Sequence, residues 1–282
     1  MSKLSLLLSI TGLILLQVFF PFNTRAQGNL LITPKRVVFE GNKRSMDLNL
    51  ANIGDDTATY AISLIEIRMT AEGGFETITE PDEGQMFASP YMRYFPRTVT
   101  LGPNEAQTVK IQVARSAGLN PGEYRSHLYF RAVPKEKPLG EEDEEVADPS
   151  SISVKLTPIF GITIPAIIKI GQPAVGVTIT DTELKFENDT LPRLSIVFNR
   201  SGNYSVYGDL AVDHFSPQGT VTRVGIANGV AVYTPNTRRR FEFSLINTAG
   251  LDLNSGRLLI SFSAPSDVRP EKYAETELVL HR

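Results

Sequence analysis

The residue types that most often carry enzyme chemistry are sparse in this chain of 282 residues. It has no cysteine, and its three histidines, His127, His214 and His281, have no second histidine or carboxylate at a spacing typical of metal ligands. Neither a Gly-x-Ser-x-Gly nucleophile motif nor a glycine-rich phosphate loop occurs. We therefore expect a binding protein and not an enzyme, with no catalytic residue, metal or cofactor. An active site assembled from distant strands is the alternative.

The charge balance gives no reason to expect a nucleic-acid partner. The net charge is −3, and the densest basic run is Arg238-Arg239-Arg240, which lies among strand-like residues. A solvent-exposed strand at a sheet edge is a sufficient explanation for that run. No motif indicates a small-molecule substrate either.

The N-terminus predicts export from the cytoplasm. Lys3 precedes an apolar run over residues 4–22, and a short polar stretch then ends at the small residue Ala26. This order is typical of a signal peptide, so we expect residues 1–26 to be cleaved from the mature protein.

Gln17 and Pro21 interrupt the run that a retained membrane anchor would need, although an uncleaved anchor is the alternative. Cleavage would remove two basic residues and change the net charge from −3 to −5. Among exported proteins, those without disulfides are more common in the bacterial periplasm than among small animal extracellular domains. We therefore expect a periplasmic location.

Alternation of apolar and polar residues with a period of two runs through the mature chain and predicts strands. Turn-forming Gly, Asn, Asp and Pro residues separate the runs. The pattern predicts seven strands in each half and thus an all-β protein of two immunoglobulin-like β-sandwich domains in tandem. The expected domains are residues 27–165 and 166–282, with residues 166–174 as the linker between the two sandwiches.

Residues 134–149 have a different composition, with seven acidic and almost no apolar side chains. Such a segment cannot bury enough apolar surface to become ordered, so we expect a solvated loop of the first domain. A calcium site is the alternative, but the alternating ligands and central glycine of a known calcium loop are absent.

An apolar stripe follows this acidic segment and is the clearest binding signal. Every even position is apolar or proline over residues 152–164: Ile152, Val154, Leu156, Pro158, Phe160, Ile162 and Ile164. This stripe is longer than a typical strand of about 5 to 6 residues. Part of the stripe can therefore pack in the chain's own core, which we expect for Phe160–Ile164, and part can serve a partner. A stripe that is core throughout is the alternative. Pro158 lacks an N–H and favours an edge position.

Short motifs in the first domain follow one another in a recognisable order. Arg36-Val37-Val38-Phe39-Glu40-Gly41 comes first, the next strand ends at Asn52, and residues 98–109 and 122–134 follow before Pro165. In this order the chain resembles the PapD-like family of bacterial periplasmic pilus or fimbrial chaperones. The likeness covers essentially the whole first domain and, in the second, only the strand content.

This resemblance implies two sandwiches set at an angle and a role in pilus assembly. The family's chaperones stabilise a secreted surface-fibre subunit by lending it the long last strand of their first domain. The implied partners are a secreted β-rich surface subunit and an outer-membrane usher. The alternative is a structural or adhesive cell-envelope protein built from the same domains without chaperone activity.

The resemblance also implies two basic side chains in the cleft between the domains, which hold the client's C-terminal carboxylate. Arg36 matches the first of them. Phe160, and not a lysine, occupies the matching second position when it is counted back from Pro165. Lys155 is then the only lysine expected on this strand, either as a replacement anchor or as a surface charge. The expected partner-binding residues are therefore Arg36, Lys155, Ile152, Val154 and Leu156.

Overall fold

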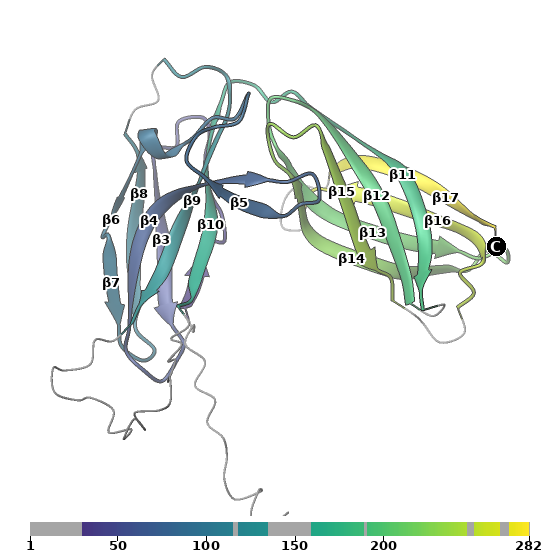
Figure 1. Ribbon diagram of the computed structural model, residues 1–282, viewed down its shortest axis with the longest axis horizontal. Coiled ribbons are helices and arrows are strands. Elements are labelled where there is room, and N and C mark those ends of the chain that lie inside the picture. Colours follow the sequence, from purple (N-terminus) through teal and green to yellow (C-terminus); the bar gives the residue numbers. More distant parts are fainter. Residues whose placement is uncertain are drawn as a thin grey trace, which may run out of the picture.

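A computed structural model describes residues 30–114, 118–134, 159–188, 191–246, 251–265 and 271–281. These residues form strands almost throughout, in two sandwiches that meet at an angle (Figure 1). The prediction of two immunoglobulin-like β-sandwiches in tandem is confirmed. No helix in the described ranges is long and apolar enough to cross a membrane.

The first sandwich packs a four-stranded sheet on a six-stranded one. The smaller sheet has the order β1 (Leu30–Thr33), β3 (Ser45–Asn52), β8 (Ala106–Val113) and β6 (Met92–Phe95), with the 3-10 turn η1 (Ser89–Tyr91) before β6. The larger sheet has the order β2 (Val37–Phe39), β10 (Gly161–Ile170), β9 (Gly122–Val133), β4 (Ala58–Met69) and β5 (Phe75–Ile78), and β7 (Thr98–Leu101) also pairs with β4.

The second sandwich packs a three-stranded sheet on a four-stranded one. The first of these has the order β11 (Val175–Glu187), β12 (Leu191–Gly202) and β15 (Arg238–Ser244). The other has the order β14 (Val221–Val232), β13 (Val206–Phe215), β16 (Ser255–Ser263) and β17 (Lys272–His281).

Each sandwich has its own core, which follows from the period-two alternation. In β3, Leu48 and Leu50 are fully buried while Asp47 and Asn49 are exposed, because successive side chains point to opposite faces of a sheet. In the second sandwich, Phe198 and Phe262 lie 4.9 Å apart between ring centroids and are both buried. Neither core needs a disulfide.

The strand β10 extends beyond the expected end of the first domain. It continues through Ile170, and Ala166, Ile167 and Ile168 are buried, two of them in the first core. The expected domain boundary after Pro165 thus falls inside this strand, and the turn between the sandwiches comprises residues 171–174. The reason is that the apolar alternation gives way to a continuous buried run after Pro165.

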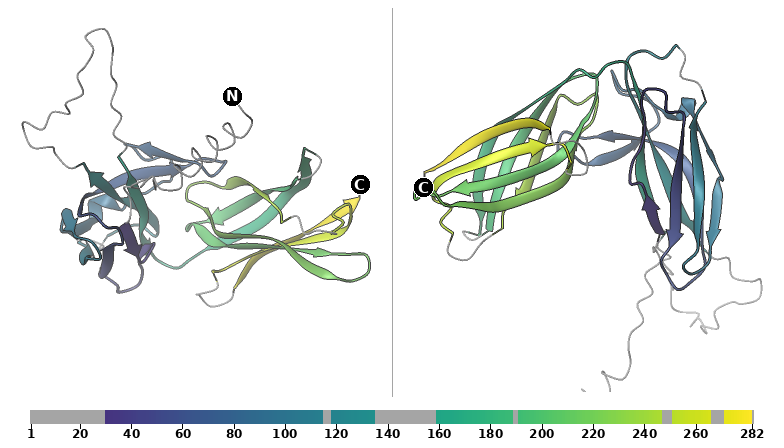
Figure 2. Two further views of the ribbon diagram at one scale, coloured as in Figure 1. Left: turned by 90° about the horizontal axis from the view of Figure 1, so that it is seen from below. Right: turned by 180° about the vertical axis from the view of Figure 1, so that it is seen from behind.

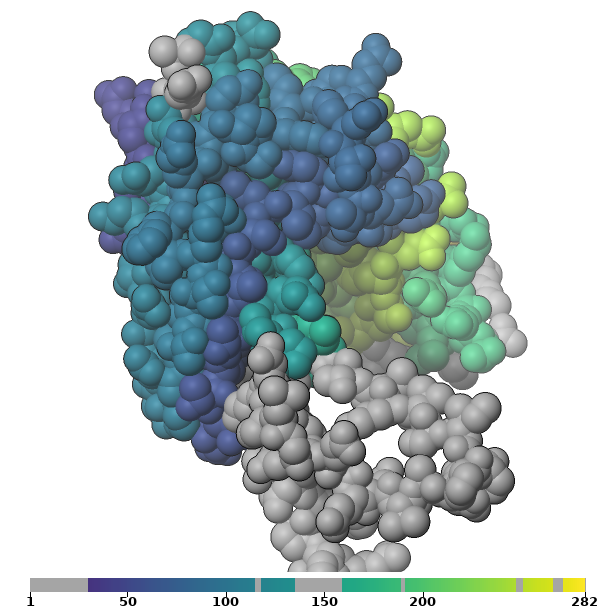
Figure 3. All heavy atoms as spheres, turned by 60° about the vertical axis from the view of Figure 1, so that its left-hand side comes forward, coloured from purple at the N-terminus to yellow at the C-terminus, as the bar shows by residue number. Residues whose placement is uncertain are grey.

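A hairpin of the first sandwich reaches across to the second. The strands β4 and β5 extend beyond their sheet, and the turn between them lies against β15 (Figures 1 and 2). The backbone N–H of Arg240 donates to the Ala71 carbonyl at 2.7 Å, and the Asn236 amide donates to the Met69 carbonyl at 2.6 Å. Figure 3 shows this hairpin, in blue, packed on the yellow-green strands of the second sandwich. The domain angle therefore depends on direct contacts as well as on a short linker.

The arginine run on β15 is only partly the exposed edge that its composition suggested. Arg238 is exposed and lies 3.3 Å from an Asp181 carboxylate oxygen. Arg239 is instead half-buried at the junction, where its side chain occupies the space that a Cβ on Gly73 would need. The hairpin covers this part of β15, so the run is a contact between domains.

Candidate binding site at the domain junction

Arg36 lies directly before β2, and its side chain reaches the second sandwich. Its guanidinium carbon lies 3.9 Å from the centre of the Tyr207 ring on β13. Burial, followed by the nearby positive charge of Arg125, lowers the pKa of Arg36. Among the described residues, no carboxylate forms an ion pair with Arg36, and its Nε atom has no hydrogen-bond partner. The junction therefore holds a cation whose charge no described side chain neutralises.

A buried carboxylate on β9 joins the two sandwiches. Glu123 is 2% exposed, and its oxygens accept hydrogen bonds from the Ser205 backbone N–H at 2.9 Å and the Ser205 hydroxyl at 2.7 Å. Arg125 donates to the same carboxylate from Nε at 3.0 Å and from Nη2. Burial alone would raise the pKa of Glu123, but Arg125 and the two Ser205 hydrogen bonds outweigh it and lower that pKa. Glu123 is therefore an ionised group that fixes the second sandwich on the first.

Aromatic rings of the second sandwich lie over cations of the first. Besides the Arg36 contact, the Arg125 guanidinium carbon lies 3.6 Å from the Tyr233 ring centre, and Lys169 Nζ lies 5.5 Å from the Tyr204 ring centre. Arg125 is paired with Glu123, and Lys169 lies 3.5 Å from a Glu40 carboxylate oxygen. Arg36 alone of the three cations has no ion pair within the described part of the chain.

His127 completes the polar face of β9. It is 4% exposed, and its ring centre lies 6.3 Å from that of Tyr233, which also contacts Phe75. Burial, followed by the Arg125 charge, lowers the pKa of His127 to about 3. The imidazole is therefore neutral at pH 7, and its Nδ1 has no hydrogen-bond partner among the residues that the structure describes.

The N-terminal half of β10 has one hydrogen-bonded neighbour. It pairs with β9 from Gly161 to Ile170, but the parallel pairing with β2 covers only Ala166–Ile168. Among the described strands, none pairs with the other edge of residues 161–165. An edge of this kind offers free backbone donors and acceptors to an additional strand.

The apolar stripe becomes more exposed toward this open end. Ile164 is 5% exposed, Ile162 is half-buried and Phe160 is 48% exposed. The expectation that Phe160 packs in the core is therefore wrong: this residue precedes the first residue of β10 and is exposed, whereas Ile162 and Ile164 do contact the core. Four expected partner-binding residues, Ile152, Val154, Lys155 and Leu156, lie outside the described residues, as do residues 1–26 and 135–150.

The strand also carries a lysine that the sequence reading did not assign to it. Lys169 belongs to β10, because the strand continues past Pro165, so the expectation that Lys155 is its only lysine is wrong.

The sequence reading also missed Glu123, Arg125 and His127. They alternate on one face of β9, opposite the buried Leu128 and Phe130, and this alternation was a visible signal of a polar face. Nothing in it shows that a second domain covers that face.

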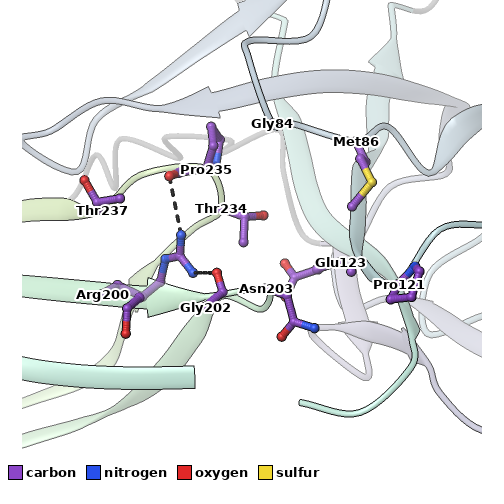
Figure 4. Close-up of a pocket in the computed structure, with 12 residues that line it drawn as sticks. Gly84, Met86, Pro121, Glu123, Arg200, Gly202, Asn203, Thr234, Pro235 and Thr237 are labelled. Atoms are coloured by element: carbon purple, nitrogen blue, oxygen red, sulfur yellow. Dashed lines mark hydrogen bonds between the residues drawn. The ribbon is translucent and has the colours of Figure 1, made fainter. Parts of the chain in front are cut away.

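A cavity of about 340 Å³ lies beside this junction, between loops of both sandwiches (Figure 4). Its most buried cation is Arg200, which donates to the carbonyls of Gly202 and Tyr204 at 2.8 and 2.9 Å and from Nε to that of Asn236 at 2.8 Å. These bonds are all to main-chain oxygens, so Arg200 shapes the loops of the second sandwich.

In the described ranges, no three His, Cys, Asp or Glu residues are grouped closely enough to hold a metal ion.

No family model and no curated protein matches the chain. Solved structures that share its fold include the YadV chaperone, at 14% identity and a TM-score of 0.44 over 90% of this chain and 100% of that chain. A chain of the CsuC–CsuE chaperone–tip subunit complex from Acinetobacter baumannii matches at 12% identity and a TM-score of 0.45, over 90% and 100% of the two chains. A chain of the SafA pilin–SafB chaperone complex from Salmonella enterica matches at 11% identity and a TM-score of 0.41, over 91% and 99%.

These neighbours are a chaperone and two chaperone complexes, one with a tip subunit of Csu pili and one with a pilin. The likeness is one of overall fold. What this chain binds must therefore be argued from its own residues.

Proposed function

We propose that this protein is a periplasmic chaperone that holds a secreted β-rich fibre subunit by strand addition. The observation that carries the proposal is the open edge of β10, where an apolar stripe becomes more exposed toward the end of the strand that has one neighbour among the described strands. Backbone groups on such an edge can pair with a client strand, while alternate side chains fill the client's apolar groove. The proposed donor residues are Ile152, Val154 and Leu156, which precede this edge in the chain.

Arg36 supplies the polar half of the proposed site. An unneutralised guanidinium is suited to a carboxylate, which it can bind through two parallel charge-assisted hydrogen bonds. Arg125 is only 5% exposed and is paired with Glu123 through Nε and Nη2, so it is less suited than Arg36 to serve as a direct anchor. The Arg125 charge instead raises the positive potential around Arg36. Lys155 stays the candidate for a second contact.

The neighbours support the class of partner, since two of them are complexes with a tip subunit and a pilin. An outer-membrane usher is a further proposed partner, and cleavage after Ala26 is the proposed route to the periplasm. If the protein were a structural or adhesive envelope component, it would be recovered in a surface assembly and not as a soluble complex with one subunit.

Arg36→Ala is expected to weaken subunit capture by roughly 10- to 100-fold, because it removes a charge-assisted contact of about 1.5–3 kcal/mol. The measurement is the amount of a β-rich subunit, co-expressed from the same gene neighbourhood, that co-purifies with the full-length protein. Arg44→Ala is the matched control, since Arg44 is an exposed arginine of the same sandwich that bonds only nearby carbonyls among the described residues. If both variants capture equal amounts of the subunit and their melting curves are unchanged, Arg36 does not belong to the binding site.

Val154→Asp is expected to abolish capture while leaving the melting temperature of the free protein nearly unchanged. An unpaired carboxylate in the client's apolar groove costs several kcal/mol, whereas a side chain outside the protein's own core costs little. Val221→Asp is the control, because Val221 is 53% exposed and lies on the second sandwich. A collapse of the melting curve of Val154→Asp to the level of a core substitution would show that residues 152–156 are core and would defeat the donor assignment.

A further inference from the structure

The ring beneath Arg36 belongs to the other sandwich. Arg36 precedes β2 in the first sandwich, whereas Tyr207 lies on β13 in the second, and 3.9 Å separates the guanidinium carbon from the ring centre. At this separation a guanidinium and a tyrosine ring are in direct cation–π contact. The position of Arg36 therefore depends on a residue 171 positions further along the chain.

The three cation–ring contacts at the junction are not equivalent. Arg125 and Lys169 each have a carboxylate partner, Glu123 and Glu40, that would hold the side chain without the ring. Arg36 has no ion pair in the described ranges, and its Nε atom is buried without a hydrogen bond. Within the described ranges, the Tyr207 ring is the cation–π partner of the Arg36 guanidinium.

We propose that Tyr207 is a positioning residue for the anchor, which holds the Arg36 guanidinium flat on its ring so that a carboxylate meets it edge-on. This inference rests on the proposed function and adds that the second sandwich forms half of the carboxylate site. A long arginine side chain loses much conformational freedom on binding. A ring that already orders the guanidinium reduces that loss, which is the general effect of preorganisation.

The prediction compares two substitutions at the same position. Tyr207→Leu removes the ring and is expected to weaken carboxylate binding roughly 5- to 30-fold, the range of a partly desolvated cation–π contact. Tyr207→Phe keeps the ring and is expected to bind within about twofold of the wild type. Phe215→Leu is the matched control, because Phe215 lies at the other end of β13 and its ring contacts Arg257 at 4.7 Å.

The experiment uses NMR of the full-length protein, with acetate as the carboxylate probe and acetamide as its neutral match. The Arg36 Nε–H signal is identified by its loss in Arg36→Ala, and its heteronuclear NOE reports how firmly the side chain is held. In the wild type, Tyr207→Phe and Phe215→Leu, we expect a high NOE and a shift with acetate but not with acetamide. For Tyr207→Leu we expect a low NOE, and a correspondingly higher acetate concentration should be needed to shift the Arg36 Nε–H signal.

Two results would overturn the inference. One is an unchanged NOE and acetate affinity in Tyr207→Leu, and the other is an equal loss in Tyr207→Phe, which would point to the hydroxyl or to a packing role. The subunit-capture assay separates this inference from the proposed function. If Arg36→Ala loses the subunit and Tyr207→Leu retains it fully, the positioning role fails and the chaperone proposal stands. If both variants retain the subunit, the anchoring role of Arg36 fails as well.

Discussion

Glu123→Ala is expected to destabilise the protein by about 3–5 kcal/mol and to uncouple the two sandwiches. The substitution leaves Arg125 as a buried charge without its carboxylate, and breaking a buried pair on one side carries a cost of this size. It also removes both acceptors of Ser205, which hold the second sandwich on the first. Scanning calorimetry of the full-length protein should show a lower melting temperature and two separated transitions.

Two variants show whether the buried charge is the cause. Glu123→Leu combined with Arg125→Met removes both charges and should recover much of the lost stability, since replacing a buried pair by apolar residues is often neutral. Asp213→Asn breaks the more exposed pair between Asp213 on β13 and Arg223 on β14 and should cost less than about 1 kcal/mol. If Glu123→Ala lowers the free energy of unfolding by no more than Asp213→Asn does, Glu123 does not join the domains.

The strand content of this chain could be predicted from its sequence because burial follows a local pattern. Leu48 and Leu50 alternate with Asp47 and Asn49, and the sheet only has to place one face inward for that pattern to be satisfied. The position of Arg36 next to the second sandwich also agrees with the family resemblance, since a residue at the start of the first domain reaches the junction. Its role in binding a partner stays a prediction.

The junction itself could not be predicted, because its contacts join residues far apart in the chain. The residues Glu72-Gly73-Gly74 are typical of a turn, and a turn is found there, but the residue types alone do not show that it lies on β15. Only the fold brings the Met69 carbonyl to the Asn236 amide. Charged side chains such as those of Glu123 and Arg125 usually face solvent, whereas here both are buried and contact Ser205 and Tyr233 of the second sandwich. Local patterns specify which face of a strand is polar, not what lies against it.

His127 makes the protein sensitive to mild acid, and the sign follows from its lowered pKa. The pKa is about 3 in the folded state, against an ordinary value of 6.5. Between these values the unfolded chain binds a proton that the folded state does not, so stability falls as the pH falls from 6.5 toward 3. The free energy of unfolding then falls by about 1.4 kcal/mol per pH unit, so that about 2 kcal/mol is lost at pH 5. Glu123 acts in the same direction, but its stabilising contribution is fully present above pH 4.5 and is lost only as the pH falls further, through its lowered folded pKa.

The window between pH 6.5 and 4.5 therefore isolates His127, and His127→Leu is expected to flatten the dependence of stability on pH there. The leucine fills a comparable volume and leaves no unpaired Nδ1, so stability at pH 7.5 should stay within about 1.5 kcal/mol of the wild type. The measurement is the free energy of unfolding in urea at pH 7.5, 6.0 and 5.0. His281→Gln is the control, because His281 is exposed at the end of β17 and should keep the wild-type slope. A wild-type slope in His127→Leu would mean that other groups carry the acid sensitivity and that the buried imidazole on β9 does not titrate as its surroundings imply.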